Sequence, residues 1–254
     1  MESTSRVHLR PEHNFRDLGG LDAAGGPVRR GVVFRSAHLH DADAEDREAL
    51  AALGIRTVCD LRAHEEAAAR PSALGSIEGV ELLRFGTVGA RVIGDPAQSI
   101  LEYGFTEVSD VDLANFYEYI LTAQPRAFGQ IAEVCADASR HAVVIHCSAG
   151  KDRTGIACAL ILSALGVSDD AVIADYEMTN ELWSPTQMAR AQPVLEEAGL
   201  VFDAVRTYFL APARAMARTL EHLREQYGSV EGFLTGPAGV APATLDALRA
   251  ALLG

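Results

Sequence analysis

The sequence predicts an α/β domain with a central, mostly parallel sheet, flanked by helices and followed by a helical C-terminal part. Short β-branched runs alternate with longer helix-like stretches, as in proteins with parallel sheets. No convincing strand pattern follows residue 168. With 254 residues, 48% of them hydrophobic, the chain can bury one sizeable core. We therefore expect residues 1–254 to form a single domain.

The individual elements follow from these patterns. "DAAGGP" is typical of a turn and predicts a small hairpin between residues 19–21 and 28–30. The predicted strands are the β-branched runs at 32–34, 57–61, 80–85 and 142–146. The predicted helices in the first two thirds of the chain cover 44–53, 111–123, 126–138 and 154–165.

The C-terminal third shows helical spacing of apolar residues, interpreted as packing surfaces. One helix is expected between Pro212 in its first turn and Gly228 at its end, and another after Pro242. Two segments, 87–105 and 184–199, fit these patterns less well. We interpret them as mobile covers or binding loops.

Composition excludes several classes of function. The net charge of −13 opposes attraction to nucleic acid. No apolar run approaches the roughly 20 residues of a transmembrane helix. The N-terminus lacks the apolar segment of a secretory signal, so we expect a cytoplasmic protein and leave leaderless secretion open. The four cysteines show neither CxxC spacing nor a zinc-binding cluster with histidine, and no metal site is predicted.

The most informative stretch is "AVVIHCSAGKDRTGIACALILSALG", residues 142–166, in which five residues separate Cys147 from Arg153. A loop from strand to helix points backbone N–H groups inward, and the helix dipole adds positive charge, which together make an anion site. Arg153 can bind two oxygens of a tetrahedral anion, and Gly150 allows close backbone approach. The same field favours the thiolate of Cys147, the nucleophilic form.

Other interpretations of this loop are weaker. A nucleotide-binding GxxxxGK[ST] loop would need glycine where Ile145 stands and a hydroxyl where Asp152 stands. A buried core thiol is common, but the small and charged residues after Cys147 are not composed like a core. A rhodanese-like sulfur transferase also uses a thiolate in a loop, but the long apolar helix and Thr154-Gly155 favour a phosphatase.

At these residues the chain resembles the Cys-based phosphatases with an HCx₅R loop. It is most similar to the bacterial atypical tyrosine and dual-specificity phosphatases with an HCxAGKDRTG loop, a family that includes secreted mycobacterial and Listeria tyrosine and lipid phosphatases. The segments "NFRDLGG", "FRS", "GIRTVCDLR" and "DYEMTNE" also occur in the order expected for that family. The resemblance implies a phosphotyrosine-phosphatase-like fold, a cysteinyl-phosphate intermediate, no metal cofactor, and a helical lid, for which 184–199 is the better candidate.

The loop residues receive roles on this basis. Cys147 is the nucleophile, and the phosphate-binding set is Ser148, Ala149, Gly150, Lys151, Asp152 and Arg153. Lys151 adds a cation that the resemblance links to phosphoinositides, or else is a solvated lysine at the loop crest. The general acid is Asp152 or Asp60, and we favour Asp152 slightly because the loop fixes it. The alternatives are a charge at the helix N-terminus for Asp152 and an ion pair with Arg62 or Arg56 for Asp60.

Supporting roles are assigned to His146, Thr154, Arg16, Asp17 and Arg35. His146 is expected to orient the loop by hydrogen bonding, or else to be a satisfied core histidine. Arg16, Asp17 and Arg35 are expected to brace the loop, with plain structural salt bridges as the alternative. Cys59 and Asp60 face opposite ways in a strand, which disfavours a disulfide between Cys59 and Cys147.

The sequence thus predicts a phosphomonoester hydrolase of the protein-tyrosine or dual-specificity type, with a phosphotyrosine protein as its substrate. Two alternatives remain, a phosphoinositide phosphatase and a noncatalytic phosphate-binding module.

Overall fold

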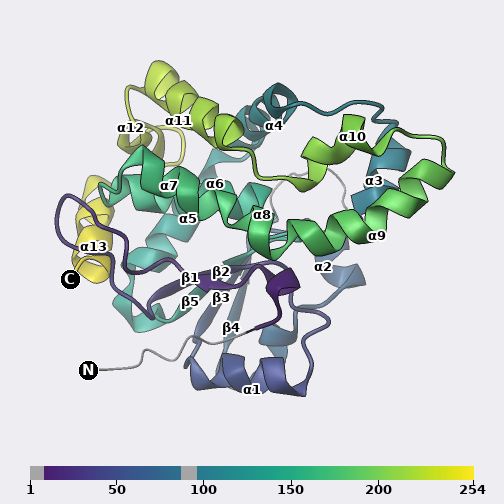
Figure 1. Ribbon diagram of the computed structural model, residues 1–254. Coiled ribbons are helices and arrows are strands. Elements are labelled where there is room, and N and C mark those ends of the chain that lie inside the picture. Colours follow the sequence, from purple (N-terminus) through teal and green to yellow (C-terminus); the bar gives the residue numbers. More distant parts are fainter. Residues whose placement is uncertain (1–8, 87–95) are drawn as a thin grey trace.

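The computed structural model describes residues 9–86 and 96–254, and its centre is a five-stranded sheet (Figure 1). The strand order is β1-β2-β5-β3-β4, and only the edge strand β1 is antiparallel to its neighbour. The strands are β1 Arg16–Asp17, β2 Val33–Ser36, β3 Thr57–Asp60, β4 Glu81–Arg84 and β5 Val143–His146. The predicted α/β class and the mostly parallel sheet are confirmed.

Strand register brings three carboxyl ends to one level. His146 at the end of β5 pairs with Ser36 of β2 on one side and with Asp60 of β3 on the other. Parallel sheets bind ligands beyond these ends, where the loops to the following helices begin. The segment after His146 therefore starts at the centre of the sheet, between two neighbouring strands.

Side chains of the strands alternate between two hydrophobic cores. In β5, Val143 and Ile145 belong to the larger core, whereas Val144 belongs to the smaller one. The smaller core also contains Leu50, from the helix drawn at the bottom of Figure 1. Because both faces of the sheet are covered, its central strands read as continuous apolar runs rather than alternating ones.

The helices are arranged in two unequal layers, with α1 on one side of the sheet and most of the others on the opposite side (Figure 1). The α-helices before the central loop are α1 Ala44–Ala52, α2 His64–Ala69, α3 Pro96–Tyr103, α4 Asp110–Ala123 and α5 Pro125–Ala136. Those after it are α6 Asp152–Ala164, α7 Asp169–Glu177, α8 Thr179–Leu182, α9 Ser184–Glu197, α10 Phe202–Val205, α11 Ala213–Tyr227, α12 Val230–Thr235 and α13 Pro242–Leu252.

Helix α6 is buried around its whole circumference, including Ile156, Leu160 and Ile161, and so fixes the position of its N-terminus. Helix α11 ends at Gly228, as expected, in the left-handed conformation with φ of 77°. Pro212 differs slightly from expectation, because it is the N-cap rather than part of the first turn.

The predicted hairpin exists only in part. Val28 exchanges backbone hydrogen bonds with Gly20 and Leu21, at 2.7 and 2.8 Å, but neither segment is a strand. The antiparallel pair at this edge is instead β1 with β2. Val28 also bridges to Leu253, so the turn docks on the C-terminus rather than extending the sheet.

The two segments that fit the sequence patterns less well, 184–199 and 87–105, differ in how much of their structure is described. Residues 184–199 are largely helical as α9, which packs against α3. Of residues 87–105, the structure shows helix α3, whereas 87–95 lie outside the described residues. Within the described parts of the chain, no helix has the length and apolar character needed to cross a membrane.

Candidate functional site

The site is the loop from β5 to α6, with Cys147 at its start and the first turn of α6 at its end. Cys147 is 2% exposed and lies against the larger core. Gly150 adopts a left-handed φ of 66°, and a Cβ there would lie 2.4 Å from the Ser36 carbonyl oxygen. Only glycine allows the loop to turn this tightly against the end of β2.

The loop's carbonyl groups point outward, to polar groups of neighbouring segments. The Ser148 carbonyl accepts a bond from the His38 N–H at 3.0 Å. The Asn14 amide donates to the Ala149 and Gly150 carbonyls, at 3.0 and 3.2 Å. Arg35 Nη2 donates to the Gly150 carbonyl at 2.7 Å.

Each peptide plane carries its N–H on the side opposite its carbonyl. Outward carbonyls at residues 148–150 therefore turn the N–H groups of residues 149–151 inward. Among the described residues, the N–H groups of 148–151 make no hydrogen bond to another backbone group. The first N–H groups of α6 add further donors without an intrahelical partner. The loop is thus a cradle of donors suited to an anion.

Arg153 is held at the rim of this cradle by Glu66 of α2. Its Nη1 and Nη2 donate to the two Glu66 carboxylate oxygens, at 2.7 and 2.9 Å. The Ser148 hydroxyl also donates to Glu66, at 2.6 Å. Burial opposes the charge of Arg153, but Glu66 and the nearby Cys147 outweigh burial and raise the pKa of the guanidinium. Arg153 is therefore a permanent cation with a fixed orientation.

A second ion-pair group braces the loop from behind. Asp175 of α7 binds Arg16 Nε at 2.8 Å and Arg35 Nη1 at 2.5 Å, and Arg16 Nη1 donates to the Asn14 side-chain oxygen at 2.7 Å. Burial disfavours the Asp175 carboxylate, but Arg35 and Arg16 outweigh it and lower its pKa. Arg35 touches the loop directly at Gly150, and Arg16 acts through Asn14 and Asp175.

Asp17 does not brace the loop, contrary to expectation. Its two carboxylate oxygens accept bonds from the N–H groups of Gly19 and Gly31, both at 2.8 Å. Asp17 therefore fixes the turns beside β1 and β2. Thr154 is fully buried at the start of α6, and its hydroxyl has no hydrogen-bond partner among the described residues.

Both carboxylate oxygens of Asp60 are bound by a neighbouring side chain. Arg62 binds both of its carboxylate oxygens, Nη2 at 2.7 Å from Oδ2, and His146 Nε2 lies 3.7 Å from Oδ2. Burial raises the pKa of Asp60, but His146 and Arg62 outweigh it and lower the pKa overall. Of the two roles considered for Asp60, the structure contains the ion pair with Arg62. His146 is buried, with a lowered pKa, and its Nδ1 contacts its neighbour's carbonyl oxygen at 3.1 Å.

Asp152 sits on α6 with its side chain 24% exposed. Tyr117 of α4 donates its hydroxyl proton to Asp152 Oδ1 at 2.5 Å, so Tyr176, 2.6 Å from Tyr117, must be the donor in that second contact. Burial raises the pKa of both tyrosines well above the ordinary value. The Tyr176 ring also explains Gly155, where a Cβ would lie 3.0 Å from the ring.

Lys151 is not a solvated lysine, because it is only 2% exposed. Its Nζ donates to the backbone carbonyls of Tyr208 and Leu210, at 2.7 and 3.0 Å, and lies 3.3 Å from Asp152 Oδ1. The side chain thus ties the loop to the segment after α10. Its backbone N–H remains among the inward donors.

A cleft of about 300 Å³ opens beside Ser148 and Ala149. Trp183, Gln187 and Arg190, at the start of α9 and along it, line the cleft, and Arg70 lies on another of its walls. The segment predicted as a lid therefore does border the loop. It is anchored at its start, where the Ser184 hydroxyl donates to the Phe209 carbonyl at 2.6 Å.

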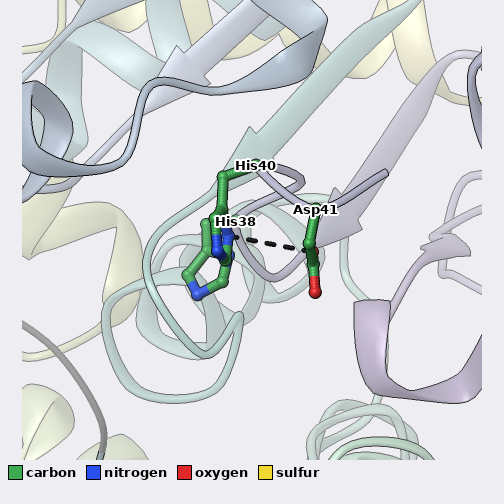
Figure 2. Close-up of side chains that lie close together, drawn as sticks. All are labelled: His38, His40 and Asp41. Carbon is green, nitrogen blue, oxygen red and sulfur yellow. Dashed lines mark hydrogen bonds and ion pairs between the residues drawn. The ribbon is translucent and has the colours of Figure 1, made fainter. Parts of the chain in front are cut away.

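The same cleft contains one group of side chains able to hold a metal. His38, His40 and Asp41 place one ligand atom each within 4.8 Å of one another (Figure 2). No metal site was predicted from the sequence, and the His-x-His spacing in "HLHD", residues 38–41, was not singled out. All four cysteines are buried and free.

Several other site residues were missed. Glu66 stands in "AHEEAAA", which reads as an ordinary acidic helix start, and it lies 87 positions from Arg153. Asn14 and Asp175 stand in the quoted segments "NFRDLGG" and "DYEMTNE", which were the available signal. No sequence signal pointed to Tyr117, because an aromatic residue on an amphipathic helix usually belongs to the core.

Comparisons with known proteins agree with this geometry. Residues 7–254 match the model of the tyrosine phosphatase family. The chain is 31% identical to the triple specificity protein phosphatase PtpB of Mycobacterium tuberculosis, over 95% of this chain and 96% of that protein. It is 34% identical to a putative tyrosine-protein phosphatase of Cupriavidus necator, over 87% of this chain and 80% of that protein. A tyrosine-protein phosphatase of Nostoc commune is 28% identical, with 87% and 74% covered.

Proposed function

This chain belongs to the tyrosine phosphatase family, and from that premise we propose that it hydrolyses phosphate monoesters of the phosphotyrosine or dual-specificity class through a cysteinyl-phosphate on Cys147. The observation that carries the proposal is the outward turn of the loop carbonyls, which leaves a ring of inward N–H donors around Cys147. A dianionic phosphoryl group matches both the shape and the charge of such a cradle.

In the bound substrate, the loop N–H groups and Arg153 hold the phosphoryl oxygens. Glu66 occupies the two Nη atoms of Arg153, and no acceptor lies at Nε among the described residues, so an N–H remains for the phosphate. These donors stay in contact as negative charge redistributes in the transition state, and they need no reorganisation because the brace fixes them. Metal ions supply this stabilisation in other phosphatases.

In the first step the Cys147 thiolate attacks phosphorus, an S–P bond forms and the P–O bond to the leaving group breaks. Asp152 protonates the leaving oxygen. Asp60 suits this role less, because the buried ion pair with Arg62 keeps it ionised and it is 1% exposed. In the second step water attacks phosphorus, Asp152 takes its proton, and the S–P bond breaks to release phosphate and the thiolate.

A phosphoinositide phosphatase remains the second candidate. Arg70 and Arg190 line the cleft beside the loop and can receive negative charges beyond the reacting phosphate. The name of the mycobacterial relative states a triple specificity for that protein. The side chain of Lys151 contributes less than expected to this alternative, because its ammonium group is bound by two backbone carbonyls.

The test compares kcat/KM for a phosphotyrosine peptide, the matching phosphoserine peptide and a phosphoinositide in detergent micelles. The proposal expects turnover of the phosphotyrosine peptide, and a higher value for the lipid would favour the second candidate. Rapid acid quenching should trap phosphate on Cys147. Failure to hydrolyse any substrate, including an activated aryl phosphate, would support a noncatalytic phosphate-binding module instead.

A further inference from the structure

The segment after β2 presents two imidazoles and a carboxylate to the same cleft. Leu39 and Ala42 are buried, at 0% and 1% exposure, and anchor the segment to the smaller core. His38 and His40 flank Leu39, so both rings project on the side away from that core. Figure 2 shows the two rings side by side, with Asp41 next to them.

The distances suit a common metal ion. The Nδ1 atoms of His38 and His40 are 2.6 Å apart, and His40 Nδ1 lies 3.7 Å from Asp41 Oδ1. Two nitrogens on a tetrahedral Zn²⁺, each at 2.0–2.1 Å from the ion, would lie about 3.4 Å apart. The two rings therefore need to separate by less than about 1 Å, which the exposed His40 can do by a small rotation beside the half-buried His38.

The donor set also selects the class of ion. Imidazole and carboxylate ligands suit Zn²⁺ and its transition-metal neighbours better than Mg²⁺ or Ca²⁺, which prefer oxygen alone. Three protein ligands leave a fourth position open to water or to a ligand in the cleft.

Some charged neighbours of the cluster oppose the binding of a dication, and others favour it. Arg70 borders the cleft, and its positive charge opposes a dication. Asp41 and Glu12 oppose that repulsion from the same cleft, and Asp60 neutralises Arg62. His13 also faces the cluster, with its Nδ1 3.9 Å from Asp41 Oδ1.

We propose that His38, His40 and Asp41 bind a divalent transition-metal ion, with Zn²⁺ as the best match, at the edge of the cleft beside the phosphate-binding loop. The His38 N–H donates to the Ser148 carbonyl at 3.0 Å, so the ion sits on a segment that is hydrogen-bonded to that loop. The ion takes no part in the displacement at phosphorus. It adds positive charge where Arg70 and Arg190 already border the cleft.

The experiment titrates Co²⁺ and then Zn²⁺ into tag-free, chelator-treated full-length protein carrying Cys147→Ser. This background removes the catalytic thiolate, which would itself bind Zn²⁺, and the remaining three cysteines are fully buried. We expect one Co²⁺ per chain, with the intense visible absorption of low-coordinate cobalt, and stoichiometric displacement by Zn²⁺. The readout does not depend on turnover, so it stands or falls separately from the proposed activity.

Two variants and a matched control locate the ion. Loss of a side chain that only hydrogen-bonds to a metal ligand typically lowers metal affinity by about 10- to 100-fold, and loss of a ligand should cost at least as much. His40→Ala should therefore weaken metal binding by roughly 100-fold or more, and Asp41→Asn by at least about 10-fold. Both residues are exposed, so circular dichroism should remain unchanged. His222→Ala on α11 should bind as the parent does. Absence of saturable binding, or binding that His40→Ala and Asp41→Asn leave intact, would overturn the proposal.

Discussion

Arg153 and Glu66 show how a single buried pair shapes the site. Both side chains are almost fully buried, and the fork geometry leaves the guanidinium one orientation relative to the loop. Glu66 also accepts hydrogen bonds from the Ser148 hydroxyl at 2.6 Å and from the Ala63 N–H at 2.8 Å, so the pair connects α2 to the loop between β5 and α6. In the proposed mechanism Glu66 is a positioning residue, since it reaches the phosphate only through Arg153.

Glu66→Gln should lower kcat/KM without abolishing it. The amide keeps the shape but loses the charge, and hydrogen bonds to charged groups are worth about 1.5–3 kcal/mol, so the loss should be roughly 10- to 150-fold. Glu66→Asp should recover part of this activity if the carboxylate matters. Equal activity of Glu66→Gln and the parent protein at matched thermal stability would assign Glu66 to folding alone.

Cys147→Ser should abolish turnover while leaving the binding of vanadate or another phosphate analogue intact. A serine hydroxyl is a far weaker nucleophile than a cysteine sulfur, so the nucleophile is lost but the donor cradle remains. Calorimetry on the variant measures the binding, and mass spectrometry of the quenched parent enzyme identifies the phosphorylated residue. Substantial activity in the variant, or phosphate on another residue, contradicts the proposed role.

The general acid can be identified by its dependence on the leaving group. A carboxylic acid that protonates the leaving oxygen contributes about 10²–10⁴-fold, and less when the leaving group is already a stable anion. Asp152→Asn should therefore slow phenyl phosphate much more than dinitrophenyl phosphate. If Asp60→Asn shows that selectivity and Asp152→Asn does not, the acid is Asp60 and Asp152 serves the helix terminus.

Among the elements, the loop between β5 and α6 was predictable because all of its determinants are local. The sequence places four features within 25 consecutive positions: the strand, the small residues of the loop, the arginine and the apolar helix. The structure has the strand, the loop and the helix in the same order. The elements that brace the loop were not predictable in the same way. Asn14 lies 136 positions from Gly150, and its contact exists only because β1 pairs with β2, and β2 with β5, in the sheet.

Helix α9 is expected to influence binding more than chemistry. Arg190→Ala removes a cation from the cleft but touches neither the loop nor its brace, so KM for an acidic phosphopeptide should rise several-fold while kcat changes little. Added salt should reduce the difference between variant and parent. Arg214→Ala, in a separate cleft beside α4, is the matched control. A fall in kcat with unchanged KM would mean that α9 acts on the chemical step.

The loop as an element also predicts resistance to chelators. In the proposed mechanism the loop N–H groups and Arg153 supply the charge stabilisation, and the proposed metal site lies beside the reaction rather than in it. Incubation with EDTA should therefore leave the hydrolysis of aryl phosphates largely intact. Complete loss that zinc or magnesium restores would place a metal in the reaction itself.

At the scale of the whole molecule, much of the buried charge lies around the loop that follows β5. Asp60, Glu66 and Asp175 each pair with arginine, and each has a pKa below its ordinary value because these partners outweigh burial. Two cores hold this charged layer in place from opposite faces of the sheet. The alternation of β-branched runs with helix-like stretches predicted the sheet and its flanking helices, but not which charges would meet between them.

This arrangement makes stability depend on pH in a defined direction. A carboxyl whose pKa is lower in the folded state stabilises fully above its unfolded value, 3.8 for Asp175, and loses that contribution as pH falls through the folded value. His146 acts earlier, because burial keeps it neutral while the unfolded chain protonates it below about pH 6.5. The melting temperature should therefore fall modestly below pH 6.5 and steeply below pH 4.

Asp175→Asn tests the carboxylate part of this prediction. The variant is destabilised at every pH, because Arg16 and Arg35 lose their shared partner, so the informative quantity is the slope rather than the melting temperature itself. The slope of unfolding free energy against pH reports how many protons the chain takes up on unfolding. Near pH 3 to 4 the variant should take up as much as one proton fewer than the parent protein. Asp17→Asn is the control variant, because the Asp17 carboxylate binds only backbone N–H groups near the surface. Identical slopes for Asp175→Asn and the parent would mean that Asp175 titrates alike in the folded and unfolded chains, and the two arginines would then not hold it ionised.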